Sequence, residues 1–167
     1  LASNVTGAFV PLSMEKMKPT ILSKDHKVLL IIHDVYQDDN VFPLGAAYLA
    51  GALRDAGASV EVYCMDLYHF TNEDLAKKLQ NERYDLIGVG FMAARFKETI
   101  LALCEVINAN KKDAWLVLGG HGPTPIPDYV LETTRADVVA MGEAEATIVE
   151  VLCCKVNKGE RSRVDGI

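Results

Sequence analysis

From Lys27 onward, the sequence alternates between short aliphatic runs typical of strands and longer segments with helical spacing. The first run, Val28–Ile32, is continuously aliphatic, as expected for a strand buried on both faces. Further strands are expected at Val60–Cys64, Leu86–Phe91, Trp115–Leu118 and Val138–Met141. The segments between them are long enough for crossovers between parallel strands. We therefore predict an α/β fold with a doubly wound, five-stranded, mainly parallel sheet, Rossmann-like or flavodoxin-like.

Helices are expected between the strands, and local signals mark several of their ends. Pro43 opens the first helix at a first-turn position, and Gly57 provides its C-terminal stop. Thr71 is expected to cap a helix over Asn72–Asn81, with Asp74 placed to complete a capping box. Apolar positions from Phe96 to Ile107 predict a third helix, and two more are expected at Pro127–Thr133 and Glu143–Val156.

Length and charge limit what this chain can be. The predicted α/β domain covers residues 27–156, whereas residues 1–26 lack periodicity, are interrupted by prolines and are expected to form an N-terminal arm with a helix near Leu12–Met17. A net charge of −6 disfavours nucleic acid as a partner. No apolar run approaches the roughly 20 residues of a membrane span. The start does not resemble a secretory signal, so we expect a cytoplasmic protein that does not associate with membranes.

The four cysteines do not predict a metal centre. Cys64, Cys104, Cys153 and Cys154 show neither C-x-x-C spacing nor the C-x-x-x-C-x-x-C spacing of a radical iron–sulfur site. Buried cysteines in a reducing cytosol are the expected interpretation. The sequence also predicts no catalytic residue, so we expect this chain alone not to catalyse a reaction.

The loops after the strands disfavour the common phosphate ligands of α/β folds. No G-x-G-x-x-G follows the first strand, where the sequence runs from His33 to Asn40, and the P-loop signature is absent. The glycines of Gly88–Gly90 lie inside a strand. A phosphoreceiver domain would need acidic residues after the first strand, an aspartate after the third and a lysine near the fifth. Asp34 fits the first of these requirements, and the other two are not met. Nucleotides and phosphotransfer are therefore disfavoured.

Two glycine-bearing turns follow neighbouring strands, at Leu118–Thr124 and at Gly142–Thr147. In an open α/β sheet, such turns let a ligand approach the backbone at the carboxyl ends of the strands. The sequence therefore predicts a binding site at this edge of the sheet.

The loops and turns, taken in order, resemble one family. The segments that carry the resemblance are Pro43–Ala50, Leu53–Gly57, Tyr84–Val89, Leu118–Pro127, Ala136–Val139 and Gly142–Glu145. This series is similar to the cobalamin-binding domain at the N-terminus of cobalamin-dependent radical S-adenosylmethionine enzymes. The resemblance covers about residues 27–167, and residues 157–167 resemble the start of a linker to a downstream domain.

The resemblance implies a function and its cofactors. The chain would bind cobalamin and position the corrinoid for methyl transfer, with a downstream radical barrel of the same protein as its partner. S-adenosylmethionine and an iron–sulfur cluster would belong to the parent protein, for which a methyltransferase is the favoured reading. Two alternatives stay open: a non-catalytic corrinoid carrier or sensor domain, and the sugar-nucleotide-binding half of a glycosyltransferase.

Ten residues are expected to contact the cofactor. Gly119 and Gly120 would provide clearance for the nucleotide tail of the corrinoid, and Phe91 and Met92 an apolar wall for its base. Gly45 begins a helix whose N-terminal amides would face polar groups of the ligand. The full expected set is Asp34, Leu44, Gly45, Phe91, Met92, Gly119, Gly120, His121, Gly142 and Glu143.

One departure from the wider cobalamin pattern concerns the axial ligand of cobalt. Carriers with D-x-H-x-x-G after the first strand use its histidine to replace the tail base on cobalt. Aligning Asp34 with the first position places Tyr36 at the histidine and Asp39 at the glycine. The sequence therefore predicts no axial histidine from this motif. His33 is expected to be a core or edge residue, and His121 to lie nearest the ligand.

Overall fold

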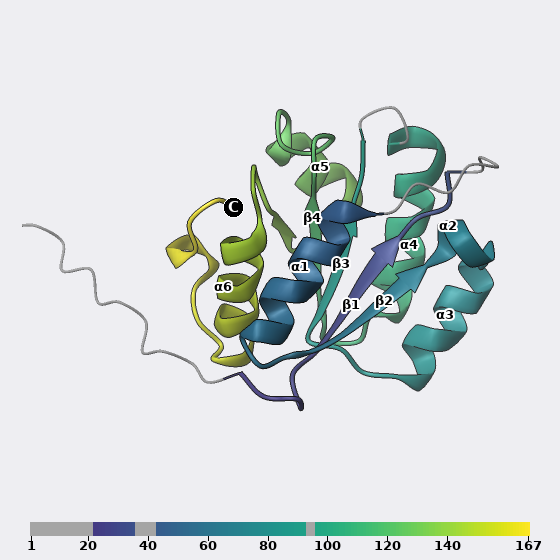
Figure 1. Ribbon diagram of the computed structural model, residues 1–167. Coiled ribbons are helices and arrows are strands. Elements are labelled where there is room, and N and C mark those ends of the chain that lie inside the picture. The colour runs from purple at the N-terminus through teal and green to yellow at the C-terminus, as the bar shows by residue number, and fades with distance from the viewer. Residues whose placement is uncertain (1–21, 36–42, 93–95) are drawn as a thin grey trace, which may run out of the picture.

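The computed structural model describes residues 22–35, 43–92 and 96–167, and it shows one sheet between two layers of helices (Figure 1). The sheet has five strands in the order β2-β1-β3-β4-β5, and each pair of neighbouring strands is parallel. The strands are β1 (Lys27–Ile32), β2 (Ser59–Cys64), β3 (Leu86–Gly90), β4 (Trp115–Gly119) and β5 (Val138–Val139). This is the flavodoxin-like order, which confirms the predicted doubly wound α/β fold.

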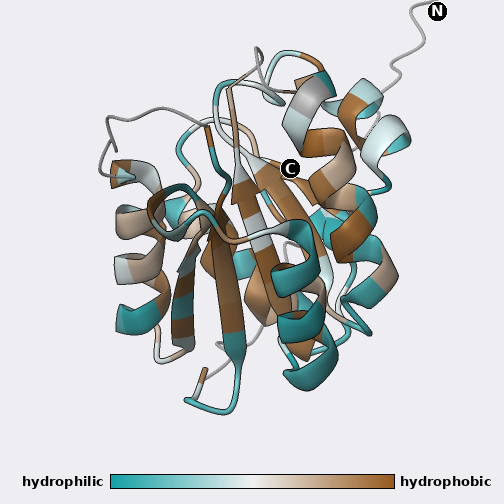
Figure 2. Cartoon of the chain, turned by 90° about the vertical axis from the view of Figure 1, so that its right-hand side faces the viewer, coloured by the Kyte–Doolittle hydropathy of each residue, from teal (hydrophilic) through white to brown (hydrophobic). Residues whose placement is uncertain are grey.

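Each face of the sheet has its own helical cover and its own apolar core. Helices α1 (Leu44–Asp55) and α6 (Glu145–Val156) cover one face. The other face is covered by α3 (Asn72–Asn81), α4 (Leu101–Asn110) and α5 (Pro127–Thr134). Because side chains alternate along a strand, Leu30 joins the core under α1 and α6 whereas Ile31 joins the other one. Figure 2 shows the strands as a hydrophobic layer between helices with hydrophilic outer turns.

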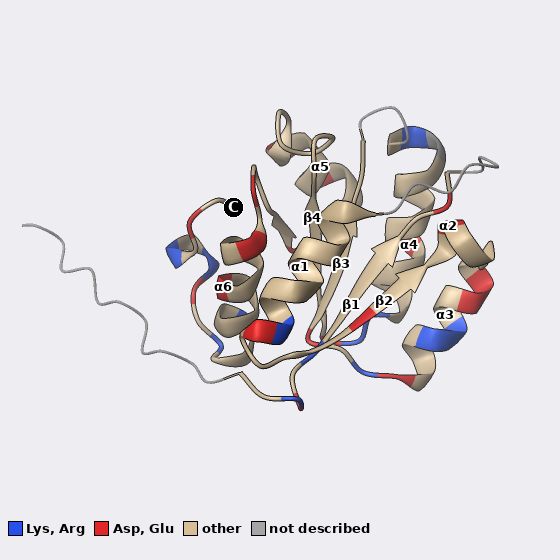
Figure 3. Cartoon of the chain, in the orientation of Figure 1, with Lys and Arg blue, Asp and Glu red and all other residues tan. Residues whose placement is uncertain are grey.

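Charged residues lie mainly on the outer turns of the helices and in the connecting loops (Figure 3). Helix α1 differs, because Arg54 and Asp55 at its C-terminal end are its charged residues, and its first turns expose Leu44 and Tyr48 instead. Among the described residues, no helix combines the length and the apolar character that a membrane crossing requires.

Two helix-end signals act as predicted, at Thr71 and at Gly57, whereas Pro43 is the N-cap of α1 and not a residue of its first turn. The Thr71 hydroxyl accepts a hydrogen bond from the Asp74 backbone N–H at 3.2 Å, and the Thr71 N–H donates to the Asp74 carboxylate at 3.1 Å. This is the capping box at the start of α3. After α1, Gly57 has φ +104°, and a Cβ there would lie 2.6 Å from the carbonyl oxygen of Leu22. Both the backbone conformation and this contact require glycine.

Some boundaries and two short elements differ from the sequence predictions. A four-residue helix, α2 (Met65–Tyr68), follows β2 directly, and a π-helical turn, η2 (Phe96–Ile100), precedes α4. Strand β5 has two residues, and α6 begins at Glu145. The later start follows from Gly142, whose φ of +67° turns the chain away from the strand before the helix can form.

Residues after α6 pack back onto the domain. They include the short helix η3 (Arg161–Arg163), and Val164 is buried in the core under α1 and α6. The carbonyl of Gly166 accepts a hydrogen bond of 2.8 Å from the N–H of Met141, which follows β5. The end of the described chain therefore lies beside the carboxyl edge of the sheet. The predicted arm lies largely outside the described residues, and the predicted linker to a further domain stays a prediction.

Candidate cofactor-binding site

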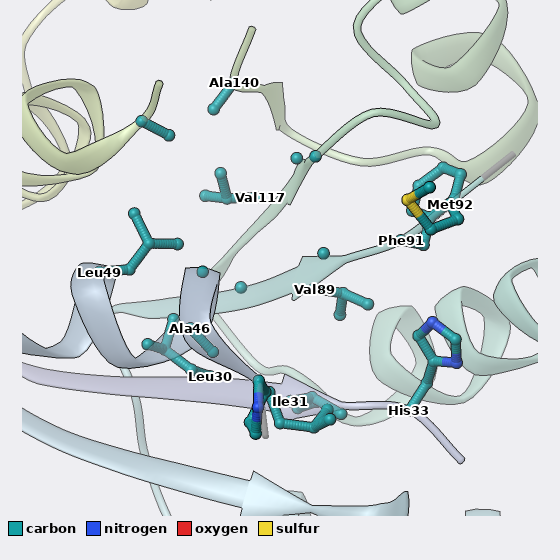
Figure 4. Close-up of a pocket in the computed structure, with 18 of the residues that line it drawn as sticks. Leu30, Ile31, His33, Ala46, Leu49, Val89, Phe91, Met92, Val117 and Ala140 are labelled. Carbon is teal, nitrogen blue, oxygen red and sulfur yellow. The ribbon is translucent and has the colours of Figure 1, made fainter. Parts of the chain in front are cut away.

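A cavity of about 750 Å³ opens at the carboxyl ends of β1, β3 and β4 (Figure 4). This is the switch point of the sheet, where chain connections leave β1 and β3 toward opposite faces, and where open α/β sheets bind their ligands. The volume falls within the range of roughly 300–1,000 Å³ typical of small-molecule sites. The cavity extends between the sheet and the helices α1 and α6, so it is a slot within one of the two cores.

The slot exists because the sheet carries small residues where the helices would otherwise pack against large ones. Gly88 on β3 pairs with Leu30 on β1 and with Val117 on β4. A Cβ at Gly88 would lie 2.9 Å from the Cδ2 atom of Leu30. Closer to the carboxyl edge, Gly90 pairs with Gly119. Side chains at these positions would project into the space that is open here.

Helical residues form the opposite wall. Figure 4 shows Ala46 and Leu49 of α1 facing Val117 and Ala140 across the open space. From α6 and its N-cap, Ile148 and Ala144 also line the slot. Because Ala46, Ala140 and Ala144 have small side chains, the space between the two layers stays unfilled at this level.

Polar groups gather at the mouth of the slot. Of the described lining residues, His33, Asp66 and His121 have polar side chains, and they follow β1, β2 and β4 respectively. Asp66 accepts a hydrogen bond of 2.8 Å from the N–H of Val35 and so fixes the start of the loop after β1. The mouth also includes the first turn of α1, whose N-cap has no side-chain hydrogen bond. Uncapped N-terminal amides can donate to a phosphate or amide of a ligand.

The turn after β4 is held by backbone hydrogen bonds to the end of β3. The N–H of Phe91 donates to Gly119 at 3.1 Å, and the N–H of Gly122 donates to the carbonyl of Phe91 at 2.9 Å. Gly120 has φ +94°, and a Cβ there would lie 3.1 Å from the carbonyl oxygen of Phe91. Gly120 is therefore required by the turn itself, and a side chain there would first meet backbone rather than the slot.

The structure brings six of the ten predicted residues to the cavity. These are Gly45, Phe91, Met92, Gly119, Gly120 and His121. Phe91 is buried, and its ring stacks on the ring of Phe96 with centroids 5.6 Å apart, whereas Met92 is 59 % exposed. Met92 is thus the more accessible part of the predicted apolar wall.

The other four predicted residues lie outside the cavity lining. Leu44, Gly142 and Glu143 are exposed. Asp34 is buried, and its carboxylate Oδ2 lies 2.7 Å from Nδ1 of His69. With the start of α3, this pair lines a second, polar hollow of about 450 Å³. Tyr36 and Asp39, which replace the histidine and glycine of the carrier pattern, lie outside the described residues.

Several lining residues were missed by sequence reasoning. The sequence places Gly88 and Gly90 in the interior of a strand, and Ala46 and Leu49 are absent from the expected set of contacts, yet all four line the cavity. A signal was available for the glycines, because two glycines separated by one residue in a buried strand lie on the same face and remove side chains from it. Small residues on the helix side have no comparable signal in a single sequence.

The described residues contain no group of three or more histidine, cysteine or acidic side chains that could hold a metal ion. Cys104 and Cys154 are buried, and Cys64 and Cys153 are half-buried. Burial raises the pKa of the Cys104 thiol to about 12 and also raises that of Cys154. Buried thiols of this kind pack as small apolar groups.

The slot lies at the switch point of the sheet, has small or aliphatic walls and carries polar side chains at its mouth, which is the arrangement of a small-molecule site in an α/β domain. The chain matches the B12 binding domain family over residues 32–152, which is most of its length, and it belongs to that family. The residues also fit such a cofactor, because the sheet omits side chains at Gly88 and Gly90 where an inserted group needs room.

Among proteins of known function, the chain is 24 % identical over 127 residues to the anaerobic magnesium-protoporphyrin IX monomethyl ester cyclase of Synechocystis sp.. That alignment covers 75 % of this chain and 26 % of the cyclase. The chain therefore spans about a quarter of the length of this relative.

Two solved structures share the fold. The radical S-adenosylmethionine methyltransferase TsrM from Kitasatospora setae, with cobalamin and a [4Fe-4S] cluster bound, superposes with a TM-score of 0.73 at 20 % identity over 87 % of this chain and 28 % of TsrM. The cobalamin-dependent radical enzyme OxsB, with aqua-cobalamin and S-adenosylmethionine bound, gives a TM-score of 0.73 at 20 % identity over 84 % of this chain and 20 % of OxsB. This domain is thus similar in fold to parts of cobalamin-dependent radical S-adenosylmethionine enzymes.

Proposed function

We propose that this domain holds cobalamin at the carboxyl edge of its sheet, with the nucleotide tail inserted in the slot between the sheet and α1. The preformed slot at the β1/β3 switch point carries the proposal, because its walls are small or aliphatic and its mouth is polar. Membership in the B12 binding domain family supports the choice of cofactor.

The residues of the chain have separable roles in this proposal. Gly88 and Gly90 admit the tail between strand and helix, and Ala46 and Leu49 contact it from α1. The N-terminal amides of α1, beginning near Gly45, donate to polar groups of the tail. When bound, cobalamin supplies a cobalt centre able to carry a methyl group, and the protein supplies position and surroundings.

The parent protein is proposed to be a cobalamin-dependent radical S-adenosylmethionine enzyme, with methyl transfer as the favoured reaction and a downstream radical barrel as the partner of this domain. Likeness in fold to TsrM and OxsB supports this proposal, as does the small share of each longer relative that the chain spans. S-adenosylmethionine and the iron–sulfur cluster belong to that parent protein. The cyclase relative leaves a reaction other than methylation as the second candidate.

Retention of a corrinoid tests the first part. The 167-residue chain, mixed with hydroxocobalamin and passed through gel filtration, should elute with the corrinoid absorbance. Ala46→Phe should abolish retention by filling the slot from the α1 side. Ala47→Phe is the matched control, because Ala47 neighbours Ala46 but is exposed and outside the lining. Failure of both the chain and the full-length protein to retain any corrinoid would refute the assignment.

The second part is tested on the full-length protein after anaerobic reconstitution with iron and sulfide. A radical enzyme should cleave S-adenosylmethionine under reducing conditions. A non-catalytic carrier or sensor should bind corrinoid but should not cleave S-adenosylmethionine. Methylated product from a candidate substrate would then separate methyl transfer from other radical reactions.

A further inference from the structure

The slot changes character from its mouth to its inner end. The polar side chains of the described lining, His33, Asp66 and His121, all follow the ends of strands and lie at the mouth. The inner lining, further from the carboxyl edge, is aliphatic or glycine. It consists of Leu30, Leu49, Gly88, Val117 and Ile148.

Backbone groups of the sheet add no hydrogen-bonding capacity at the inner end. Leu30, Gly88 and Val117 each lie on a strand that has a partner strand on both sides at that residue. Their N–H and C=O groups are directed along the sheet toward neighbouring strands. On the opposite wall, Leu49 lies within α1, where the backbone is hydrogen-bonded along the helix.

Building on the proposed cobalamin function, we infer that this slot is selective for corrinoids whose tail ends in an apolar aromatic base, such as 5,6-dimethylbenzimidazole, over corrinoids whose tail ends in a purine. The benzimidazole carries two methyl groups that suit an aliphatic wall. Adenine instead carries an exocyclic amine and extra ring nitrogens. A buried polar group without a partner lowers affinity by about 5- to 150-fold.

Leu49 is the specificity-determining residue that the structure offers for a test. Its side chain lines the slot from α1 and faces Val117 and Ala140, as Figure 4 shows. It is half-buried, so a polar replacement does not disturb a fully closed core. Leu49→Gln places an amide with both a donor and an acceptor at the slot wall. Leu49→Met keeps the wall apolar at similar volume and is the matched control.

The experiment compares two corrinoids, one with a 5,6-dimethylbenzimidazole tail and one with an adenine tail, both with cobalt in the +2 state. Equilibrium dialysis gives the Kd of each for the parent chain and for both Leu49 variants. The two free corrinoids differ in how firmly the base binds cobalt, but that difference is the same for every protein. The informative quantity is therefore the ratio of the two Kd values and its change between variants.

Leu49→Gln should shift this ratio toward the adenine-tailed corrinoid by about threefold to tenfold, the gain expected from one new hydrogen bond. Leu49→Met should leave the ratio unchanged. Val117→Thr, which replaces a methyl group by a hydroxyl with little change of shape, should shift the ratio in the same direction as Leu49→Gln. It replaces that variant if Leu49→Gln does not fold.

Two negative results are distinguishable. If both corrinoids bind and the ratio is the same in the parent and in the folded polar variants, the selectivity inference is overturned while the cobalamin function stands. If the parent binds neither corrinoid, the proposed function itself is refuted, and the inference with it.

Discussion

Gly88→Ala should weaken corrinoid binding while leaving the stability of the free domain nearly unchanged. The new Cβ would lie 2.9 Å from Cδ2 of Leu30, against an ordinary carbon–carbon contact of about 3.5–4.0 Å. The methyl group of Leu30 must therefore move by roughly 0.6–1 Å, and the adjacent open space is the slot. Gly88 does not have a positive φ, so its backbone conformation is open to alanine.

The free-energy effect of Gly88→Ala differs between the free and the corrinoid-bound domain. In the free domain Leu30 moves into open space, and the lower entropy of the unfolded alanine chain contributes about 0.4–1 kcal/mol of stability. The net change in the free energy of unfolding should stay within about 1 kcal/mol. With the tail bound, the displaced methyl has no space, and overpacking costs about 1–3 kcal/mol. The Kd for hydroxocobalamin should rise by about 5- to 150-fold.

Urea unfolding measures the first quantity, and equilibrium dialysis against hydroxocobalamin measures the second. Gly51→Ala is the control, because nothing lies within 4 Å of a Cβ at this α1 position, which is outside the slot. It should stabilise the helix by up to about 1 kcal/mol and leave the Kd unchanged. A Kd for Gly88→Ala within twofold of the parent would refute the claim that the tail occupies this part of the slot.

Three further predictions concern the turn, the outer sheet edge and the histidines. Gly120→Ala should lower the free energy of unfolding by about 1–3 kcal/mol because φ is +94° there, whereas Gly119→Ala, whose Cβ would lie 3.5 Å from the nearest atom, should be near neutral; equal losses in urea titrations would contradict this. Lys78 donates to Glu61 at 2.6 Å and Glu82 at 2.8 Å, and its hydrogen bond lowers the pKa of Glu82 below the usual 4.5. Lys78→Met should therefore lower the free energy of unfolding by about 1 kcal/mol at pH 7. The effect is small because the Glu82 side chain is 43 % exposed. A carboxyl whose pKa is lower in the folded than in the unfolded state stabilises the fold at pH values above its unfolded pKa. The difference in the free energy of unfolding between parent and variant should therefore shrink as the pH falls from about 5 to 3. A difference that stays constant would show that the ion pair contributes nothing. Electron paramagnetic resonance of the cobalt(II) corrinoid complex should show no nitrogen splitting from the protein; a triplet that disappears in His33→Ala would instead identify His33, which lines the slot, as an axial ligand.

The strands and helices could be predicted because the signals that mark them are local. Continuous aliphatic runs such as Val28–Ile32 mark strands buried on both faces, and the segments between the runs are long enough for parallel crossovers. The capping box at Thr71 and Asp74 is likewise local, because it depends on a segment of four residues. These features need no knowledge of which strand lies beside which.

The slot could be predicted in part because its walls depend on register. Gly119 and Gly120 lie at the end of a strand and mark a turn, so the sequence was sufficient to predict them as site residues. The two glycines of Gly88–Gly90 mark a strand face without side chains, but the neighbour of Gly88 is Leu30, a residue 58 positions earlier, and no local pattern gives that pairing. The contact between Asp34 and His69 is of the same kind, since it joins residues 35 positions apart through the short helix α2.

An apolar slot of this size also has a consequence for stability. A filled core in the same place would gain the burial and dispersion energy that the free domain lacks at Leu30, Leu49 and Val117. Because a ligand that binds the folded state alone adds RT ln(1 + [L]/Kd), hydroxocobalamin at 100 times its Kd should raise the free energy of unfolding by about 2.7 kcal/mol. Thermal unfolding with and without hydroxocobalamin measures this gain. Ala46→Phe should raise the melting temperature of the free domain if the ring fills the slot, and should remove the response to corrinoid. A variant that still gains stability from corrinoid would show that the ligand binds somewhere other than this slot.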